Sequence, residues 1–342
     1  MVEPEALSNQ TTKEETNMQA IRLTGPCEAS ALKPVEVPKP EAKAGFDVVQ
    51  VKAFRVNESE VTSRKGESDG DFQYPRILGI EGTGVIDTPA ADSPYQRGQK
   101  VAMMMDGLGR AIDGSYAEYC LVPHAAMIPL ETDLDWDLVG ALPEMLQTIY
   151  GSLNKGLNLT AGDTVLIRGG SSTVGLMSIG LAKMLGATVL ATTRSQAKVA
   201  KLTAMGADHV LIDDGHIAAQ VHDLLPEGVD KALELVGTTT LTDTFGAVKP
   251  AGKLCFTGGL GGGWEIEHFS PFMIPSGKFL TSYAGEAQDL PAKIFNQVLA
   301  EAKAGKLSVP IAKVYHGLSE VGEAQANLES GHFVGKHVVV LD

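Results

Sequence analysis

A glycine-rich turn near the middle of the chain has residue types that can hold the phosphates of a nucleotide. The turn reads GGSSTVG, residues 169–175, and it follows the apolar segment VLIR, residues 165–168. A helix beginning at Thr173 or Val174 would present free backbone N–H groups and the positive end of its dipole to a pyrophosphate. The turn residues expected to bind a dinucleotide are Gly170, Ser171, Ser172, Thr173 and Val174. Such a turn could also simply join a strand to a helix.

The end of the next apolar segment, TVLATT at residues 188–193, indicates which dinucleotide binds. NAD sites usually place an acidic residue here for the ribose 2′-hydroxyl, whereas an arginine accommodates a 2′-phosphate. This chain has Thr193, Arg194 and Ser195, followed by Lys198. A guanidinium can hold a phosphate with two parallel hydrogen bonds. The pattern therefore predicts NADPH, unless Arg194 and Lys198 are only solvated charges at the start of a helix.

Six apolar segments that alternate with helical patterns must position these residues. The expected strands cover residues 165–168, 188–193, 209–213, 231–236, 253–258 and 278–283. The expected helices between them cover residues 174–185, 195–205, 216–225 and 240–248. This alternation is typical of an α/β fold with a Rossmann, doubly wound parallel sheet of six strands. The ligand crevice of such a sheet lies at the carboxyl ends of its strands.

The flanking parts of the chain have a different pattern. Residues 18 to about 125 contain short strands broken by Gly and Pro, which indicates a β-barrel. The last part has helical patterns at 291–304 and 319–330 and a final apolar strand, HVVVL. The first 17 residues are polar, so we expect a disordered tail, and translation could also start at Met18.

Composition limits the partners. The formal net charge is -14, and an acidic chain repels nucleic acid and anionic membranes. The sequence has no apolar run long enough to predict a membrane-spanning helix. Its three cysteines, Cys27, Cys120 and Cys255, lie too far apart for a CxxC motif, and a disulfide framework is not indicated. We therefore expect a cytoplasmic protein that binds a small molecule, and neither nucleic acid nor a membrane.

Several longer motifs follow one another along the chain, and their order and spacing are informative. They read YPRILGIEGTGVI, GGSSTVGLMSIGLAKMLGATVLATTRS, KLTAMGADHVLIDD, GVDKALELVG and GHFVGKHVVVL. On these motifs the chain from Met18 to Asp342 resembles the medium-chain dehydrogenases and reductases, and within them the zinc-independent quinone oxidoreductase branch. The resemblance implies a GroES-like β-barrel domain formed from both ends of the chain, a central Rossmann domain and a homodimer.

The same resemblance divides the chain into segments. The expected divisions are a disordered tail at 1–17, the first part of a GroES-like catalytic domain at 18–142, an NADPH-binding Rossmann domain at 143–280 and a return to the catalytic domain at 281–342.

The resemblance also bears on metal binding. Zinc-dependent relatives place a cysteine where this chain has Asn57 and a histidine where it has Ile80, and their third ligand falls near Glu144. A catalytic zinc site needs three protein ligands, commonly His or Cys. An amide, an alkyl group and one carboxylate do not make such a site, so we expect no metal.

The reaction expected without zinc is reduction of an electron-poor acceptor. The resemblance implies transfer of hydride from NADPH to a quinone or to an α,β-unsaturated carbonyl compound (enone). The residues expected to face the substrate are Asn57, Thr62 and Arg64. The further residues expected at the cofactor are Thr148, Leu235, Val236, Gly237, Phe256, Thr257, Gly258, Phe333, Gly335 and Lys336.

Some alternatives stay open at this point. Quinone reductases often have a tyrosine where Thr62 stands, and Asn57 could instead stabilise a turn. The protein could be a specialised biosynthetic reductase of one enone or ketone, or a cofactor-binding relative with little turnover. The segment GGLGGGW, residues 258–264, is expected to form a mobile loop at the mouth of the cleft, where Trp264 could pack against a bulky substrate.

Overall fold

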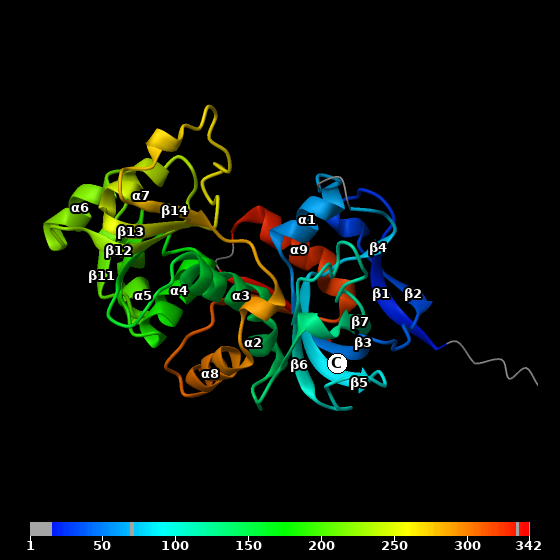
Figure 1. The fold of residues 1–342 in the computed structure, drawn as a ribbon. Helices are drawn as coiled ribbons and strands as arrows, with labels where there is room; N and C mark the ends of the chain where they lie inside the picture. Colours follow the sequence, from blue (N-terminus) through cyan, green and yellow to red (C-terminus); the bar gives the residue numbers. More distant parts are fainter. Residues whose placement is uncertain (1–15, 69–71, 333–334, 342) are drawn as a thin grey trace, which may run out of the picture.

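A computed structural model describes residues 16–68, 72–332 and 335–341. Figure 1 shows two lobes side by side. The green-to-yellow middle of the chain forms one lobe, and the blue-to-cyan first part forms the other together with the red last part. The two ends of the described chain therefore lie in the same lobe.

The middle lobe is built on a six-stranded sheet in the order β11-β10-β9-β12-β13-β14, with all its strand pairs parallel. Its strands are β9 (Thr164–Arg168), β10 (Thr188–Thr193), β11 (His209–Ile212), β12 (Val229–Glu234), β13 (Val248–Phe256) and β14 (Phe279–Ser282). This is the strand order of a doubly wound Rossmann fold. The predicted α/β fold class is confirmed.

Helices cover both faces of this sheet. They are α4 (Thr173–Met184), α5 (Val199–Ala204), α6 (Ile217–Leu224) and α7 (Leu241–Ala247). Leu166 and Leu190 pack on the face of α6 and α7, whereas Val165 and Ile167 pack on the face of α4. Strands buried on both faces read as continuous apolar runs. The sequence pattern could therefore locate them.

The other lobe contains a seven-stranded, mainly antiparallel sheet along the path β15-β16-β3-β5-β6-β8, with β7 also paired to β3. Its strands are β3 (Phe46–Arg55), β5 (Glu81–Thr88), β6 (Lys100–Met104), β7 (Tyr119–Pro123), β8 (Met127–Pro129), β15 (Ile311–His316) and β16 (Lys336–Val340). A smaller sheet joins β1 (Asn17–Leu23), β2 (Pro34–Pro38) and β4 (Arg76–Ile77). Because β16 pairs with β3, the last part of the chain completes this GroES-like lobe, as predicted.

The remaining helices pack on or between the lobes. They are α1 (Glu58–Lys65), α2 (Trp136–Gly140), α3 (Pro143–Gly151), α8 (Ala292–Lys303) and α9 (Val321–Ser330), with a π-helical turn, η3 (Ser152–Gly156), after α3. The 3₁₀ turns are η1 (Ala29–Ala31), η2 (His124–Ala126), η4 (Gln196–Lys198), η5 (Pro271–Met273), η6 (Ala287–Asp289) and η7 (Leu318–Glu320). Helix α3 lies between the lobes and contacts β5, β6 and α4. In the described part of the chain, no helix has the length and apolar character needed to cross a membrane.

Candidate cofactor and substrate site

The glycine-rich turn is tightly closed. Ser172 caps α4, because its Oγ accepts a hydrogen bond from the Gly175 N–H at 3.0 Å and donates one to the Gly169 carbonyl at 2.8 Å. A Cβ on Gly175 would lie 2.3 Å from that carbonyl oxygen, so only glycine fits this approach of helix to strand. The start of α4 thus offers the backbone cradle that a pyrophosphate needs. The Ser172 hydroxyl hydrogen is used inside the turn, while Ser171 and Thr173 are only partly buried.

The next predicted cluster lies at the carboxyl end of β10. Arg194 and Lys198 are exposed, and neither side chain has a hydrogen bond, ion pair or ring contact with another described residue. Thr193 is buried, and its Oγ1 accepts a hydrogen bond from the Ser195 N–H at 3.2 Å. The end of β10 is therefore held by hydrogen bonds, and the N–H groups of the two cationic side chains after it can donate to a ligand.

A second arginine near the turn was missed by the sequence analysis. Arg168 ends β9 and is fully buried. Its Nε and Nη2 donate to the two carboxylate oxygens of Asp213 at 2.9 and 2.8 Å, and its Nη1 donates to Asp243 at 2.7 Å. Burial alone would raise the pKa of Asp213, but the hydrogen bonds and charge of Arg168 hold it below its usual value. Arg168 thus ties the end of β9 to the residue after β11 and to the start of α7.

The carboxylate of Glu234, at the end of β12, holds the following segment. It accepts hydrogen bonds from the N–H groups of Val236 at 2.7 Å and Gly237 at 3.2 Å. Burial raises the pKa of Glu234, although the Thr244 hydroxyl and these N–H groups oppose the shift. The Thr257 N–H donates to the Glu234 carbonyl at 3.0 Å, so the segments after β12 and β13 are neighbours.

The structure therefore brings most of the predicted cofactor residues to one edge of the sheet, because parallel strands end on the same side. These residues are Gly170, Ser171, Ser172, Thr173, Val174, Thr193, Arg194, Ser195, Lys198, Leu235, Val236, Gly237, Phe256, Thr257 and Gly258.

The glycine segment 258–264 makes backbone hydrogen bonds to the segment that follows β12, and its expected mobility stays a prediction. The N–H groups of Leu260 and Gly261 donate to the carbonyls of Leu235 and Val236, at 3.0 and 2.6 Å. The Thr238 N–H in turn donates to the Gly263 carbonyl at 3.0 Å. Glycines allow this close backbone pairing.

Helix α3 brings Thr148 to the same edge of the sheet. The Ser152 Oγ donates to the Thr148 carbonyl at 2.7 Å and lies 2.9 Å from Thr257 Oγ1. The half-buried Thr148 hydroxyl donates to Glu144 Oε1 at 2.7 Å. Thr148 thus stands where the helix between the lobes meets the ends of β12 and β13.

Asn57 lies in a buried acidic environment at the start of α1. Its Nδ2 donates to Glu81 at 3.0 Å and to Glu60 at 3.3 Å, and Glu60 also accepts the Ile80 N–H at 3.0 Å. Burial raises the pKa of Glu60 to about 7. Because both amide hydrogens of Asn57 are donated within this cluster, a substrate carbonyl would have to displace one of them.

The other two residues expected at the substrate, Thr62 and Arg64, donate their hydrogen bonds to other parts of the protein. The buried Arg64 donates to Gln325 at 2.8 Å and to the Cys27 carbonyl at 2.7 Å, and it pairs with Glu329. Its guanidinium therefore joins α1 to α9. The Thr62 Oγ1 donates to the Glu58 carbonyl at 2.9 Å, within α1.

Of the residues expected at the cofactor, Phe333, Gly335 and Lys336 belong to a segment that the structure describes only in part. Phe333 lies outside the described residues. Gly335 packs against β15, since a Cβ there would lie 2.5 Å from the Ala312 nitrogen, and Lys336 begins β16.

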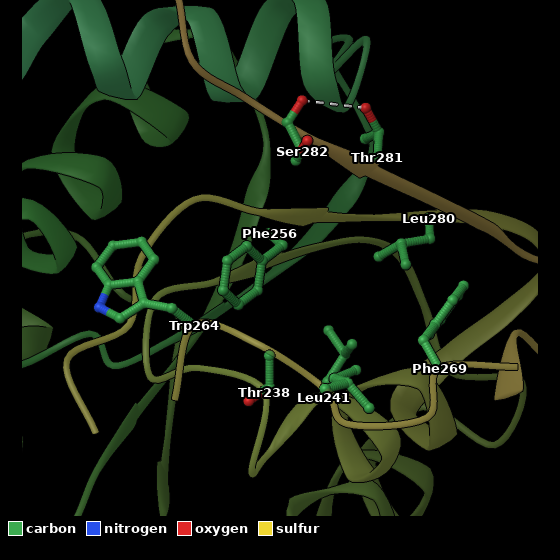
Figure 2. A pocket seen from close by; sticks show the side chains of 9 residues that line it. Thr238, Leu241, Phe256, Trp264, Phe269, Leu280, Thr281 and Ser282 are labelled. Atoms are coloured by element: carbon green, nitrogen blue, oxygen red, sulfur yellow. Dashed lines mark hydrogen bonds between the residues drawn. The ribbon is translucent and has the colours of Figure 1, made fainter. Parts of the chain in front are cut away.

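An apolar hollow of about 350 Å³ opens next to Phe256. Figure 2 shows Phe256, Trp264, Phe269 and Leu280 around it. The rings of Phe256 and Trp264 meet edge to face, with their centroids 6.1 Å apart. Trp264 and Phe269 are exposed, so the hollow is open to solvent.

The described residues fit a dinucleotide better than a metal. The glycine turn lets the start of α4 approach β9 closely, and the Arg194 side chain after the neighbouring strand pairs with no other described residue. No group of three His, Cys, Asp or Glu side chains suited to a metal ion occurs among the described residues. Asn57 and Ile80 stand at two positions where the family resemblance implies zinc ligands, and neither side chain suits zinc.

Comparison with known proteins gives consistent results. Residues 44–132 match the alcohol dehydrogenase GroES-like domain, and residues 173–300 match the zinc-binding dehydrogenase family. A probable quinone oxidoreductase of Leishmania amazonensis is 28% identical over 323 residues, covering 90% of each chain. An NAD-dependent alcohol dehydrogenase of Saccharolobus solfataricus is 27% identical and covers 94% of this chain and 100% of its own. The crystal structure of AibC superposes with a TM-score of 0.86 at 26% identity, covering both chains completely.

Proposed function

Because the chain belongs to the medium-chain dehydrogenases and reductases, in their quinone oxidoreductase-like branch, we propose that it is an NADPH-dependent reductase of quinones or enones. A nicotinamide cofactor follows from the family. The observation that supports the phosphorylated form is Arg194 at the end of β10, which pairs with no other residue that the structure describes, with Lys198 close behind it.

The choice between the two cofactors depends on the ribose 2′ position. An acidic residue there would bind a hydroxyl and repel a phosphate. Residues 193–198 contain no acid and two exposed cations. The planar guanidinium of Arg194 can form two parallel hydrogen bonds to a phosphate. One relative is described as NAD-dependent, so this strand end is the feature to test.

The residues around Asn57 suit a hydride acceptor whose carbonyl group needs little polarisation by the protein. When bound, the cofactor supplies a hydride to the acceptor. The chain holds the nicotinamide side near Thr148 and excludes water with the two lobes. Quinones and enones are electron-poor before they bind, so a strong Lewis acid is not required, and the proton can come from solvent.

The decisive experiment crosses NADPH and NADH with quinones, enones, aldehydes and alcohols in a spectrophotometric assay. We expect NADPH oxidation with quinones or enones. Arg194→Ala, alone and with Lys198→Ala, should raise the KM for NADPH at least about tenfold, because hydrogen bonds to charged groups contribute roughly 1.5–3 kcal/mol. The KM for NADH should change little.

Arg22→Ala is the matched control, since it removes an exposed arginine from β1. It should leave both Michaelis constants unchanged. Equal effects of Arg194→Ala on the two cofactors would refute the role of the 2′-phosphate. Tight NADPH binding without turnover of any acceptor would refute the reductase.

We also propose that two copies associate through β14. In the described sheet β14 pairs only with β13, so its outer edge is open. Phe272 is 97% exposed and Phe279 is 55% exposed, and large exposed apolar patches mark protein interfaces. Phe272→Asp should shift the mass measured by light scattering from dimer to monomer. Leu224→Asp, at an exposed apolar position on α6, should leave the dimer intact.

The compartment is proposed from the cysteines. Cys27, Cys120 and Cys255 are all unpaired, which suits the reducing cytoplasm.

A further inference from the structure

A buried ionic cluster joins the barrel to helix α3. Arg55, the last residue of β3, is only 3% exposed. Its Nε donates to Glu81 at the start of β5, and its Nη2 donates to Glu144 in the first turn of α3. We call these three residues the Arg55 cluster. Buried charges are costly unless they are paired and hydrogen-bonded, and one guanidinium pairs both carboxylates here.

Both carboxylates also form hydrogen bonds with groups of α3. Glu81 accepts the backbone N–H of Glu144 at 2.7 Å, so it holds the start of the helix. Glu144 uses its other oxygen to accept the Thr148 hydroxyl at 2.7 Å. One carboxylate therefore links the Arg55 guanidinium to the Thr148 hydroxyl.

The direction of this last hydrogen bond has a consequence. The Thr148 hydroxyl has two acceptors, Glu144 Oε1 at 2.7 Å and Gln147 Oε1 at 3.3 Å. An ionised carboxylate only accepts hydrogen bonds, so in the shorter contact the Thr148 hydroxyl donates its hydrogen to Glu144. The lone pairs of Thr148 Oγ1 are then the part left to meet a ligand. A carboxamide N–H, such as that of nicotinamide, is the complementary donor.

We propose that Arg55 is a positioning residue for the nicotinamide, which acts through Glu144 to keep the Thr148 hydroxyl in its accepting orientation. The inference rests on the proposed function, because Thr148 has this role only in a protein that binds a nicotinamide cofactor.

Arginine is required by the geometry of the cluster. Nε and Nη2 reach two different carboxylates, which the single ammonium group of a lysine cannot reproduce. Without the guanidinium, the buried Glu81 and the partly buried Glu144 would be neighbouring carboxylates of like charge, and Glu144 would turn away or become protonated. Either change removes the fixed acceptor for the Thr148 hydrogen.

The test compares two ligands of the full chain. NADPH contains the nicotinamide, whereas 2′,5′-ADP contains only the phosphorylated adenosine half. Both dissociation constants are measured by calorimetry for the wild type, Arg55→Met, Thr148→Val and the double variant. We expect each single variant to weaken NADPH binding about tenfold, the effect of one lost hydrogen bond. Binding of 2′,5′-ADP should stay within about twofold of the wild type.

The double variant tests whether Arg55 acts through Thr148. If it does, Arg55→Met/Thr148→Val binds NADPH no more weakly than Thr148→Val alone. Additive losses, or an equal loss for 2′,5′-ADP, would overturn the proposal. If Arg55→Met does not fold, Glu144→Gln replaces it. Its amide oxygen would face Arg55 and its NH₂ group would face Thr148, which reverses the hydrogen bond and should cost the same tenfold.

Failure of this inference is distinguishable from failure of the proposed function. Suppose that the wild type binds and oxidises NADPH, but that the variants leave the ratio of the NADPH and 2′,5′-ADP dissociation constants unchanged. This result refutes only the role of Arg55. A wild type that does not bind NADPH refutes both.

Discussion

The buried Arg168 should be a major contributor to the stability of the sheet. Arg168→Met keeps most of the apolar volume but leaves Asp213 and Asp243 without their cation. Removing one partner of a buried ion pair typically costs about 3–5 kcal/mol. The Asp213 and Asp243 side chains are 10% and 23% exposed and can regain some water, so we expect a loss near the lower end, about 3 kcal/mol.

The assay is urea unfolding followed by circular dichroism, with thermal unfolding as a second measure. A loss of this size lowers Tm by about 6–12 °C for a domain of 150–250 residues. The matched control is Arg194→Met, which removes an exposed arginine at the end of the neighbouring strand β10. Surface substitutions usually change stability by less than about 0.5 kcal/mol.

The pH dependence of this loss provides an independent check. The pKa of Asp213 is lower in the folded protein than in the unfolded chain, so the folded state binds fewer protons around that pKa. Stability from the Arg168–Asp213 pair is therefore present at neutral pH and is lost as the pH falls below about 4. The difference between wild type and Arg168→Met should shrink over the same range. A variant as stable as Arg194→Met at pH 7 would refute the reasoning.

Two further predictions concern the cofactor turn and the buried acid beside Asn57. Gly175→Ala should abolish tight NADPH binding and destabilise the sheet, because the new Cβ would lie 2.3 Å from the Gly169 oxygen. The control is Gly25→Ala, which should do neither, because no atom lies within 4 Å of a Cβ at that position. Calorimetry and thermal unfolding measure both effects. Glu60 has a folded pKa of about 7, above its unfolded value, so its contribution to stability is greatest at low pH and declines as pH rises toward 7. The wild type should lose on the order of 3 kcal/mol from this group between pH 5 and 8, and Glu60→Gln should lack that part of the slope in urea unfolding.

The sequence was sufficient for the sheet because its signals are local. Each strand of the Rossmann lobe is a short apolar run, and the expected strand at 188–193 coincides with β10. The glycine turn and the cationic end of β10 are likewise contained in a few consecutive residues. Parallel strands end on one side of the sheet, so correct strand positions were enough to bring the predicted cofactor residues together.

The polar interior could not be predicted in this way because its partners are distant in sequence. Arg64 was expected at the substrate, but it bonds to Gln325, and only the packing of α9 on α1 brings them together. Arg168 gave one local signal that was not used. A charged residue that ends a buried apolar strand needs buried partners, since an isolated interior charge is very costly.

The three arginines near the site show why burial decides which of them can recognise the cofactor. Arg55 and Arg168 are buried, and each already pairs with two carboxylates. A phosphate that took over these donors would displace an existing partner and leave that carboxylate unpaired. Arg194 has no such partner among the described residues, so a phosphate would gain its donors without breaking another bond. Specificity for the 2′-phosphate is therefore expected at Arg194, while the two buried arginines hold the surrounding groups in place.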